Sequence, residues 1–464
     1  MNMNKVNFDI YQSPFSWRYG SQEMRELFSE INRRKNWRKV WVALAKAQSK
    51  SGLITKQELA DIIKNQDKVN IEKAQEIEKE MSHDLMAEIK VFASQAKIGG
   101  GKIHLGATSQ DIEDNADAVI LNQAANIVEE KLKKLLSEFA QKIDKNKNLV
   151  CMAYTHLQPA EPTTLGYRFS IYAQDLLLDL ELLRFTKTQI KGKGTKGAVG
   201  TYASYYSLLG QKTQSMENQV LAELGIDAFD VTTQVYPRKL DWLILSALSS
   251  IAGSLYKFAF DVRIMQSAGF GEWAEPFGTK QVGSSAMPFK RNPILSERIC
   301  SIARHLIGFT QTAWQNAANS LLERTLDDSA ARRVILPEGF LAVDEIISLA
   351  AKIIEGLTIN SGAIQKNLTK YGPFAAIESI LLTTVKNGAD RQKIHEVLRK
   401  ASMDAHAHIE LTGNNPLLES IKRDKQITKY LKNTQIDALM HFEKHIGLAP
   451  KKATQIASKI KRII

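Results

Sequence analysis

One short segment of the chain gathers side chains that are suited to catalysis. The segment GSSAMPFKRNP (283–293) holds two serines, a lysine, an arginine and an asparagine. Asn292 can cap a helix and Pro293 suits a first helical turn, so the segment is predicted to be a loop held at a helix N-terminus. Backbone donors at such a terminus favour anions, and Lys290 and Arg291 add positive charge. An ordinary interhelical loop is the alternative, but no strong capping box explains this composition, so we favour a functional loop.

A histidine in a second segment can move a proton. Thr155-His156-Leu-Gln158-Pro159 places His156 just before a proline. Its side chain is a candidate general acid, because the pKa of histidine lies near neutrality. Most single histidines are structural, so this assignment depends on the other segments.

A third segment offers a seat for a carboxylate. HLGATS (104–109) is followed by Asp111, Glu113 and Asp114, and acidic residues suit the first turn of a helix. Thr108 and Ser109 are then hydroxyl groups beside free backbone N–H groups at a helix start, where a substrate carboxylate can bind. Simple capping by the same two residues is the alternative, and both can hold at once.

A fourth segment, ERTLDDSAARR (323–333), is suited to a phosphate. Ser329 and Arg333 are four residues apart and share a helical face. Arg324 would lie on the opposite side of an unbroken helix, so Arg324 and Arg333 converge only if the chain bends within 326–328. An Arg–Ser–Arg set around such a bend fits a phosphate. Asp328 and Arg332 are also four apart, which predicts a surface ion pair.

Other chemistries find little support. GKGTKGAVG (192–200) lacks the Gly-Lys-Ser/Thr ending of a phosphate loop. The histidines of HFEKH (441–445) lack the order found in zinc proteases, and His406 and His408 have no third ligand nearby. Cys151 and Cys300 are predicted to be core residues. We therefore expect no metal.

Long helices are predicted to position these segments. No proline occurs between Pro14 and Pro159, and apolar residues recur at three- and four-residue steps from Ile112 to Ile143. Similar stripes in 165–190, 239–268, 294–322 and 340–357 predict helices of about 25 to 35 residues, well above the usual mean of about 11 to 12. Strand-like alternation is scarce. The fold class is therefore all-α, with long helices in a bundle that oligomerises.

Short joints divide this helical chain. They are predicted at 98–101, 192–200, 269–283 and 360–371. The predicted organisation is an N-terminal helical domain (1–110), a central long-helix bundle domain that carries the catalytic loop (111–360) and a C-terminal helical domain (361–464).

Composition limits the classes of function. The 464 residues are 44% hydrophobic with a net charge of +12. Apolar runs are broken by charge before the ~20 residues that a membrane span needs, and the N-terminus has no apolar signal core, so the expected location is cytoplasmic. The positive charge is dispersed. The basic KKATQIASKIKRI stretch near the C-terminus keeps apolar spacing, which indicates a terminal helix with a solvated face and not a nucleic-acid arm.

Taken together, the motifs resemble the fumarase/aspartase superfamily, whose members share a GSSxMPxKxNP loop. Within it, the resemblance is to the adenylosuccinate lyase family and covers nearly the whole chain in order, weakening after about residue 400. The motifs that carry the resemblance are GSSAMPFKRNP (283–293), RTLDDSAARR (324–333), HLGATS (104–109), THLQPA (155–160), SHDLMA (82–87), YQSPFSWRY (11–19) and QVYPRKLD (234–241).

The resemblance implies an all-helical homotetramer whose central helices form a common core. Each active site takes segments from three subunits. The implied reaction is a β-elimination that breaks a C–N bond and releases fumarate, usually without a cofactor. The implied substrates are adenylosuccinate, which gives AMP, and the succinyl-aminoimidazole-carboxamide ribotide (SAICAR), which gives AICAR.

By matching position, the resemblance implies that Ser284 is the general base and His156 the general acid. Lys290, Asn292 and the Thr108–Ser109 turn are implied to stabilise the carbanion. The resemblance places the remaining substrate contacts at Arg18, Tyr19, Ser82, His83, Asp84, Gln234, Arg298, Arg324, Ser329 and Arg333.

Some alternatives remain open. Ser285 can replace Ser284 as the base. Glu88 and Lys90 stand where some members carry histidines, and Ala331 stands where asparagine is expected, which affects substrate preference. The rival functions are another fumarate-releasing lyase, for which the Arg324–Arg333 segment has no phosphate to bind, and a non-catalytic helical scaffold or nucleic-acid-binding protein. The scaffold predicts salt-sensitive binding to nucleic acid.

Overall fold

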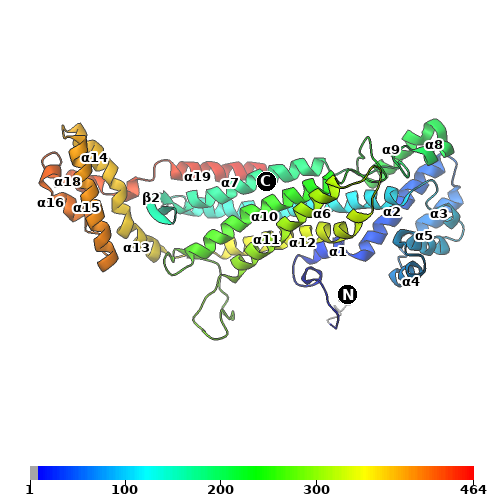
Figure 1. Ribbon diagram of the computed structural model, residues 1–464, viewed down its shortest axis with the longest axis horizontal. Coiled ribbons are helices and arrows are strands. Elements are labelled where there is room, and N and C mark those ends of the chain that lie inside the picture. The colour runs from blue at the N-terminus through cyan, green and yellow to red at the C-terminus, as the bar shows by residue number, and fades with distance from the viewer. Residues whose placement is uncertain (1–8) are drawn as a thin grey trace. The chain divides into compact units, whose positions relative to one another are not determined.

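The computed structural model describes residues 9–464, and most of them are helical. Figure 1 shows the helices and the loops that join them. The helices are α1 (Gln22–Leu27), α2 (Glu30–Lys50), α3 (Lys56–Asn65), α4 (Ile71–Met81), α5 (Asp84–Gln95), α6 (Ser109–Asn146), α7 (Leu165–Thr188), α8 (Ala203–Leu209), α9 (Thr213–Leu224), α10 (Lys239–Met265), α11 (Ile294–Ala318), α12 (Asp327–Gly356), α13 (Ser361–Tyr371), α14 (Ile377–Lys386), α15 (Arg391–Thr412), α16 (Leu417–Arg423), α17 (Lys425–Thr428), α18 (Asn433–Leu439) and α19 (Ala449–Ile463).

The chain forms two compact units. The first unit comprises Met1–Leu132, Asp179–Gly253 and Ser301–Ser348, and the second comprises Lys133–Leu178, Ser254–Cys300 and Leu349–Ile464. The unit boundaries cut through the five longest helices of the described residues, namely α6, α7, α10, α11 and α12. This partition by contacts differs from the predicted division at residues 110 and 360, which stays a prediction.

The predicted all-α class is confirmed, and the long helices form where the apolar spacing indicated. Helix α6 has 38 residues and α12 has 30. In the second unit, Phe139 of α6 packs edge-on against Phe258 of α10, with ring centroids 5.2 Å apart and both rings fully buried. Burial of such aromatic surface, more than helix propensity, holds helices of this length together.

Helix α10 is long and strongly apolar. Among the described residues it is the one helix long and apolar enough, by length and composition alone, to cross a membrane. Half of its most apolar window is buried inside the protein, as expected for a core helix.

Helix α12 departs from the proline rule on which the helix boundaries were predicted. Pro337 lies in its interior, where it removes one backbone hydrogen bond. The helix continues because apolar side chains on both sides of this point, among them Leu336 and Phe340, are buried. Packing of these side chains therefore offsets the local cost of the proline.

A β-hairpin interrupts the helices of the second unit. Strand β1 (Val150–Thr155) pairs antiparallel with β2 (Gln158–Thr164), with a register shift between Met152 and Tyr154. A second short ladder pairs β3 (Trp273–Ala274) with β4 (Thr358–Ile359). The scarcity of strands was predicted, but the hairpin replaces the loop expected around His156.

The last predicted joint is wrong, because 361–371 forms α13. Asn360 caps this helix by accepting a hydrogen bond from the Ala363 backbone N–H at 3.1 Å. Beyond it, α14, α15, α16 and α18 enclose a separate apolar core that includes Ile380, Leu398 and Ile421. The C-terminal basic stretch forms helix α19, as expected. Both cysteines are buried and free, also as expected.

Candidate functional site

The first unit contains a pocket of about 330 Å³ whose wall includes Arg324, Ser329 and Arg333. Arg324 precedes α12, which begins at Asp327, while Ser329 and Arg333 lie on the helix itself. The break at the helix start is the bend that the sequence required for these three side chains to converge. The predicted Arg–Ser–Arg set is therefore brought together.

Two of the other arginines of the pocket wall, Arg238 and Arg332, are held by carboxylates. The Arg238 guanidinium donates to Asp114 at 3.0 Å and to Asp328 at 2.7 Å. Arg332 donates to Asp241 at 2.7 Å and to Asp117 at 3.1 Å. Burial alone would lower the pKa of Arg332, but Asp241 and its other anionic neighbours hold that pKa well above its usual value. Both arginines are therefore structural cations of the pocket wall.

The predicted surface ion pair between Asp328 and Arg332 is wrong. Asp328 is buried, and its two oxygens accept from Arg238 and from Arg324 instead, the latter at 2.8 Å. A buried carboxylate takes the partners that satisfy both of its oxygens, so helical spacing alone does not select its partner.

The segment SHDLMA (82–87) is linked to the pocket through Arg333. Ser82, in the left-handed backbone region with φ 54°, ends α4, and His83 caps α5 by accepting from the Met86 backbone N–H at 3.4 Å. Asp84 then accepts a hydrogen bond from Arg333 at 2.6 Å. Burial alone would raise the pKa of Asp84, but the guanidinium of Arg333 outweighs it and keeps the pKa below its ordinary value.

The Thr108–Ser109 turn begins α6 beside this segment. The Ser109 hydroxyl lies 3.5 Å from Nε2 of His83. The Thr108 backbone N–H donates to the Asp111 carboxylate at 3.0 Å. The third residue of the helix thus reaches back and caps its start, as in the capping alternative, and carboxylate binding at the Thr108–Ser109 turn stays a prediction.

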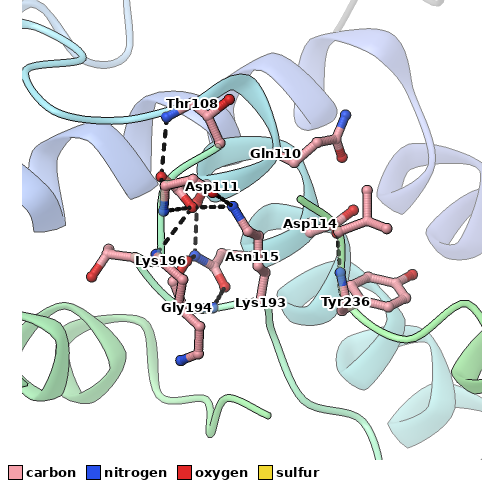
Figure 2. Close-up of polar contacts among 12 residues, drawn as sticks. Thr108, Gln110, Asp111, Asp114, Asn115, Lys193, Gly194, Lys196 and Tyr236 are labelled. Carbon is pink, nitrogen blue, oxygen red and sulfur yellow. Dashed lines mark hydrogen bonds and ion pairs between the residues drawn. The ribbon is translucent and has the colours of Figure 1, made fainter. Parts of the chain in front are cut away.

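Asp111 also holds the glycine-rich loop of the first unit, as Figure 2 shows. Its oxygen Oδ1 accepts from Nζ of Lys193 at 2.5 Å and from the Lys196 backbone N–H at 3.2 Å. Asp111 and Lys193 are fully buried. This loop, which lacks a phosphate-loop ending, therefore braces the turn that carries Thr108.

His104 begins the same motif. Its backbone is left-handed with φ 70°, and its Nδ1 accepts a hydrogen bond from the indole N–H of Trp41 at 3.1 Å. Burial lowers the pKa of His104 to about 4. The ring is therefore neutral near pH 7 and serves as an acceptor.

The N-terminal candidates lie on a segment that is tied to α12. The Ser21 backbone N–H donates to Asp344 at 2.6 Å, and the Gly20 N–H donates to Glu345 at 3.1 Å. Arg18 is exposed, with its guanidinium 5.9 Å from the ring centroid of the partly buried Tyr19. Gln234 lies elsewhere in the first unit. Its backbone N–H donates a hydrogen bond to the carbonyl of Glu323, next to Arg324, at 3.1 Å.

The second unit carries the segment 283–293 as a loop that projects from the ends of α10 and α11 (Figure 1). The Ser284 hydroxyl oxygen accepts from the Met287 backbone N–H at 3.1 Å. The Asn292 side chain donates to the Gly283 carbonyl at 2.8 Å and closes the loop. Lys290 is exposed. A backbone N–H that donates to the Ser284 hydroxyl oxygen favours negative charge on that oxygen, which a serine base requires.

The anion site predicted at the start of α11 is already filled by the protein. Helix α11 begins at Ile294, and the buried Glu275 carboxylate accepts from the backbone N–H groups of Leu295 and Ser296 at 3.0 and 2.9 Å. Asn292 therefore closes the loop and does not cap the helix. Arg298 lies farther along α11 and is partly buried.

His156 occupies the two-residue turn of the hairpin. His156 and Leu157 have φ values of 54° and 60°, and both side chains are exposed. A turn with two positive φ values suits the twist of a hairpin, but left-handed backbone costs about 1–2 kcal/mol per non-glycine residue. The buried Glu272 supports the hairpin by accepting from the Tyr154 hydroxyl at 3.0 Å.

The candidate residues thus fall into two groups. The first unit brings together Ser82, His83, Asp84, Ser109 and Arg333, and its pocket adds Arg324 and Ser329. The second unit carries His156, Ser284, Lys290, Asn292 and Arg298. Among residues 9–464, the His156 side chain makes no hydrogen bond or ion pair with any other side chain.

The charged residues of the pocket wall that sequence reasoning missed include Arg33, Glu113, Arg238 and Arg332. Glu113 was detectable, because Ser109, Glu113 and Asp117 are spaced four apart on one face of α6. Nothing in the sequence near Arg33 indicated the pocket, since Asp84 and Glu113, which face it there, come from distant segments. Among the described residues, no group of three or more His, Cys, Asp or Glu side chains is arranged to hold a metal ion.

Comparison with solved structures agrees with the helical fold. The chain superposes on a 3-carboxy-cis,cis-muconate lactonizing enzyme from Pseudomonas putida with a TM-score of 0.86, 22% identity and coverage of 97% of this chain and 99% of that one. A fumarate lyase from Mesorhizobium sp. BNC1 gives a TM-score of 0.84, 21% identity and the same coverage. At this level of identity, the likeness concerns the fold alone.

Sequence comparison is more specific. Residues 17–308 match the Lyase family, and residues 373–455 match the adenylosuccinate lyase C-terminus family. The chain is 42% identical to the adenylosuccinate lyase of Schistosoma mansoni over 90% of this chain and 88% of that protein. It is 37% identical to that of Saccharomyces cerevisiae, with coverage of 98% and 95%, and 37% identical to that of Pyrococcus horikoshii, with coverage of 96% of both chains. The chain therefore belongs to the adenylosuccinate lyase family.

Proposed function

We propose that this chain is a lyase that cleaves adenylosuccinate to AMP and fumarate, and SAICAR to AICAR and fumarate. The observation that carries the proposal is the convergence of Arg324, Ser329 and Arg333 on one pocket in a chain of this family. Two guanidinium groups and a hydroxyl suit the phosphate that both substrates carry. No cofactor takes part in the proposed reaction.

The proposed reaction is a β-elimination in which one residue removes a proton and another donates one. The Ser284 oxygen takes the proton from the carbon next to the carbon that bears nitrogen, the electron pair forms the double bond of fumarate, and the C–N bond breaks. His156 gives its proton to the departing nitrogen, a transfer that typically contributes about 10²–10⁴-fold. Hydrogen bonding from the Met287 N–H, together with the charge of Lys290, favours the serine alkoxide.

The remaining polar groups are proposed to hold the substrate. Lys290, Asn292 and the Thr108–Ser109 turn stabilise the carboxylate that carries the carbanion's charge. Arg18, Tyr19, Arg324, Ser329 and Arg333 bind the ribose phosphate. Ser82, His83, Asp84, Gln234 and Arg298 complete the substrate contacts.

We also propose that the protein is a cytoplasmic homotetramer whose sites are completed by residues of neighbouring subunits. The lack of a polar partner for His156 within the described chain supports shared sites. Exposed apolar side chains along α7, including Leu178 and Phe185, offer an oligomeric interface. Two free, buried cysteines fit a reducing compartment.

The test is to incubate purified protein with adenylosuccinate, follow the ultraviolet spectrum and identify products by chromatography. Equimolar AMP and fumarate are expected. The same assay with argininosuccinate and aspartate is the control for related lyases. Release of fumarate from one of those substrates, with none from adenylosuccinate, would contradict the proposal.

A further inference from the structure

Arg33 of α2 lines the same pocket as Arg324, Ser329 and Arg333. Its side chain is 23% exposed, so it is neither buried in the core nor free in solvent. Its guanidinium carbon lies 4.7 Å from the ring centroid of the fully buried Trp37, which fixes the position of the charge.

The carboxylates around Arg33 are too distant to satisfy it. Glu30 lies at 3.6 Å, and Asp84 and Glu113 each lie at 3.9 Å from its terminal nitrogens. Within residues 9–464, the Arg33 guanidinium donates no hydrogen bond, although it has five N–H donors.

Each of these three carboxylates has a closer partner. Glu30 accepts from Arg34 at 2.8 Å, Asp84 accepts from Arg333 at 2.6 Å, and Glu113 accepts from Gln110 at 2.5 Å. The carboxylates thus hold Arg33 in place electrostatically without occupying its donors. The donors of Arg238 and Arg332, in contrast, are directed at buried carboxylates.

Asp84 links Arg33 to Arg333 of the Arg–Ser–Arg set, because it contacts both arginines through the same oxygen, Oδ2. The two guanidinium groups therefore face the pocket beside each other. A phosphate oxygen that binds Arg333 is within reach of a neighbouring cation whose donors are unused.

We propose that Arg33 is an additional phosphate-binding residue of the substrate pocket and that Glu113 controls how strongly it attracts the anion. The ligand is the phosphate monoester of a nucleotide. The assignment rests on the proposed function for the identity of that nucleotide, but the anion site itself can be tested by binding alone.

Glu113 supports this assignment through its charge. Burial and the Asp84 carboxylate together raise the pKa of Glu113 to about 7, while Arg33 opposes the shift. The charged groups that face it are Arg33 from α2, Asp84 from α5, Asp114 and Asp117 from α6, and Arg333 from α12. Near neutral pH, Glu113 can accept a proton when an anion arrives, and this removes a negative charge next to the phosphate.

The experiment measures binding of AMP, adenosine and fumarate, together with kcat and KM for adenylosuccinate, in Arg33→Gln. We expect the Kd for AMP and the KM to rise about 10-fold or more, in line with loss of charge-assisted hydrogen bonds. The Kd values for adenosine and fumarate and the kcat should stay within about twofold. Arg33→Lys keeps the charge but not the planar fork, and should weaken AMP binding by a smaller factor.

Lys39→Gln is the matched control, since Lys39 is an exposed cation on the same helix outside the pocket. It should bind AMP like the unmodified protein. Raising the pH from 6 to 8 should weaken AMP binding less in Glu113→Gln than in the unmodified protein. Comparing the two proteins cancels the effect of the ligand's own ionisation.

Three results would overturn the proposal: unchanged AMP binding in Arg33→Gln, an equal loss of affinity for adenosine, or an equal effect of Lys39→Gln. If the unmodified protein binds AMP but does not cleave adenylosuccinate, the proposed function fails while the anion site remains testable. If it cleaves adenylosuccinate and Arg33→Gln behaves like it, only the role of Arg33 fails.

Discussion

At the residue scale, His104 illustrates how burial fixes a protonation state. Its folded-state pKa of about 4 lies below the ordinary value of 6.5, so the unfolded chain binds an extra proton between these pH values. We expect the His104 contribution to the free energy of unfolding to be retained in full above pH 6.5. As the pH drops to 4, the free energy of unfolding should fall by about 2–3 kcal/mol. Denaturant unfolding at several pH values measures this loss.

The variant His104→Asn isolates the effect. Asparagine cannot be protonated in this range, tolerates the left-handed backbone, and offers an oxygen to the Trp41 N–H. Its unfolding free energy should change less between pH 6.5 and 4 than that of the unmodified protein. His408→Asn removes an exposed histidine and should leave the profile as it was. An unaltered pH profile in His104→Asn would contradict the predicted linkage.

Arg333→Ala tests the phosphate role of the pocket. We expect it to raise the Kd for AMP by about 10- to 100-fold, because hydrogen bonds to a charged group contribute about 1.5–3 kcal/mol. Fumarate has no phosphate, so its Kd should change little. Calorimetry with both ligands measures the difference. Equal losses for AMP and fumarate would show that Arg333 acts only by holding Asp84.

The residue scale also shows where prediction from sequence stops. The common face of Ser329 and Arg333 and the bend before Asp327 follow from helical spacing and were predicted. The partners of Asp328 were not, because Arg238 from a distant segment and Arg324, four residues earlier, bind it in place of Arg332. Glu88, noted as a departure from family histidines, pairs with Arg38 at 2.6 Å in the core, which no local pattern indicated.

At the element scale, the segment 283–293 depends on close backbone packing. A Cβ atom on Gly283 would lie 1.9 Å from the Lys290 carbonyl oxygen, so alanine would force the loop open. We expect Gly283→Ala to lower kcat by about 100-fold, since small displacements of catalytic groups have effects of this size. The Kd for AMP should stay within about twofold, because the phosphate pocket lies in the first unit.

Gly278→Ala is the matched control for this prediction. A Cβ atom at Gly278 meets nothing closer than Gln281 at 3.7 Å, which is ordinary van der Waals contact. Its steady-state kinetics should match those of the unmodified protein. A normal kcat in Gly283→Ala would show that the closed loop is not needed for turnover.

Elements were more predictable than their ends. The long helices followed from apolar spacing, because a buried stripe at helical period has few other solutions. The hairpin at His156 escaped prediction, since its turn uses two left-handed residues that are not glycine. Helix α13 was taken for a joint and α12 continues past Pro337, because long-range packing decided both.

At the scale of the whole molecule, the proposal that active sites are shared between subunits leads to a prediction. Ser284→Ala and His156→Ala should each abolish turnover, since the first removes the proposed base and the second the proposed acid. Ser284→Ala should keep its affinity for AMP. Near-normal rates in Ser284→Ala would remove it as the base and direct attention to Ser285.

Mixing the two inactive variants should restore activity if each site takes these residues from different subunits. With random exchange in a symmetric tetramer, about one site in four receives both native residues, so recovery should approach about a quarter of the normal rate. Native mass spectrometry of differently tagged variants verifies the exchange. A mixture of Ser284→Ala with Ser284→Ala,His156→Ala is the control and should stay inactive, because no subunit supplies the base. Exchange without recovery would place His156 and Ser284 of each site on one subunit.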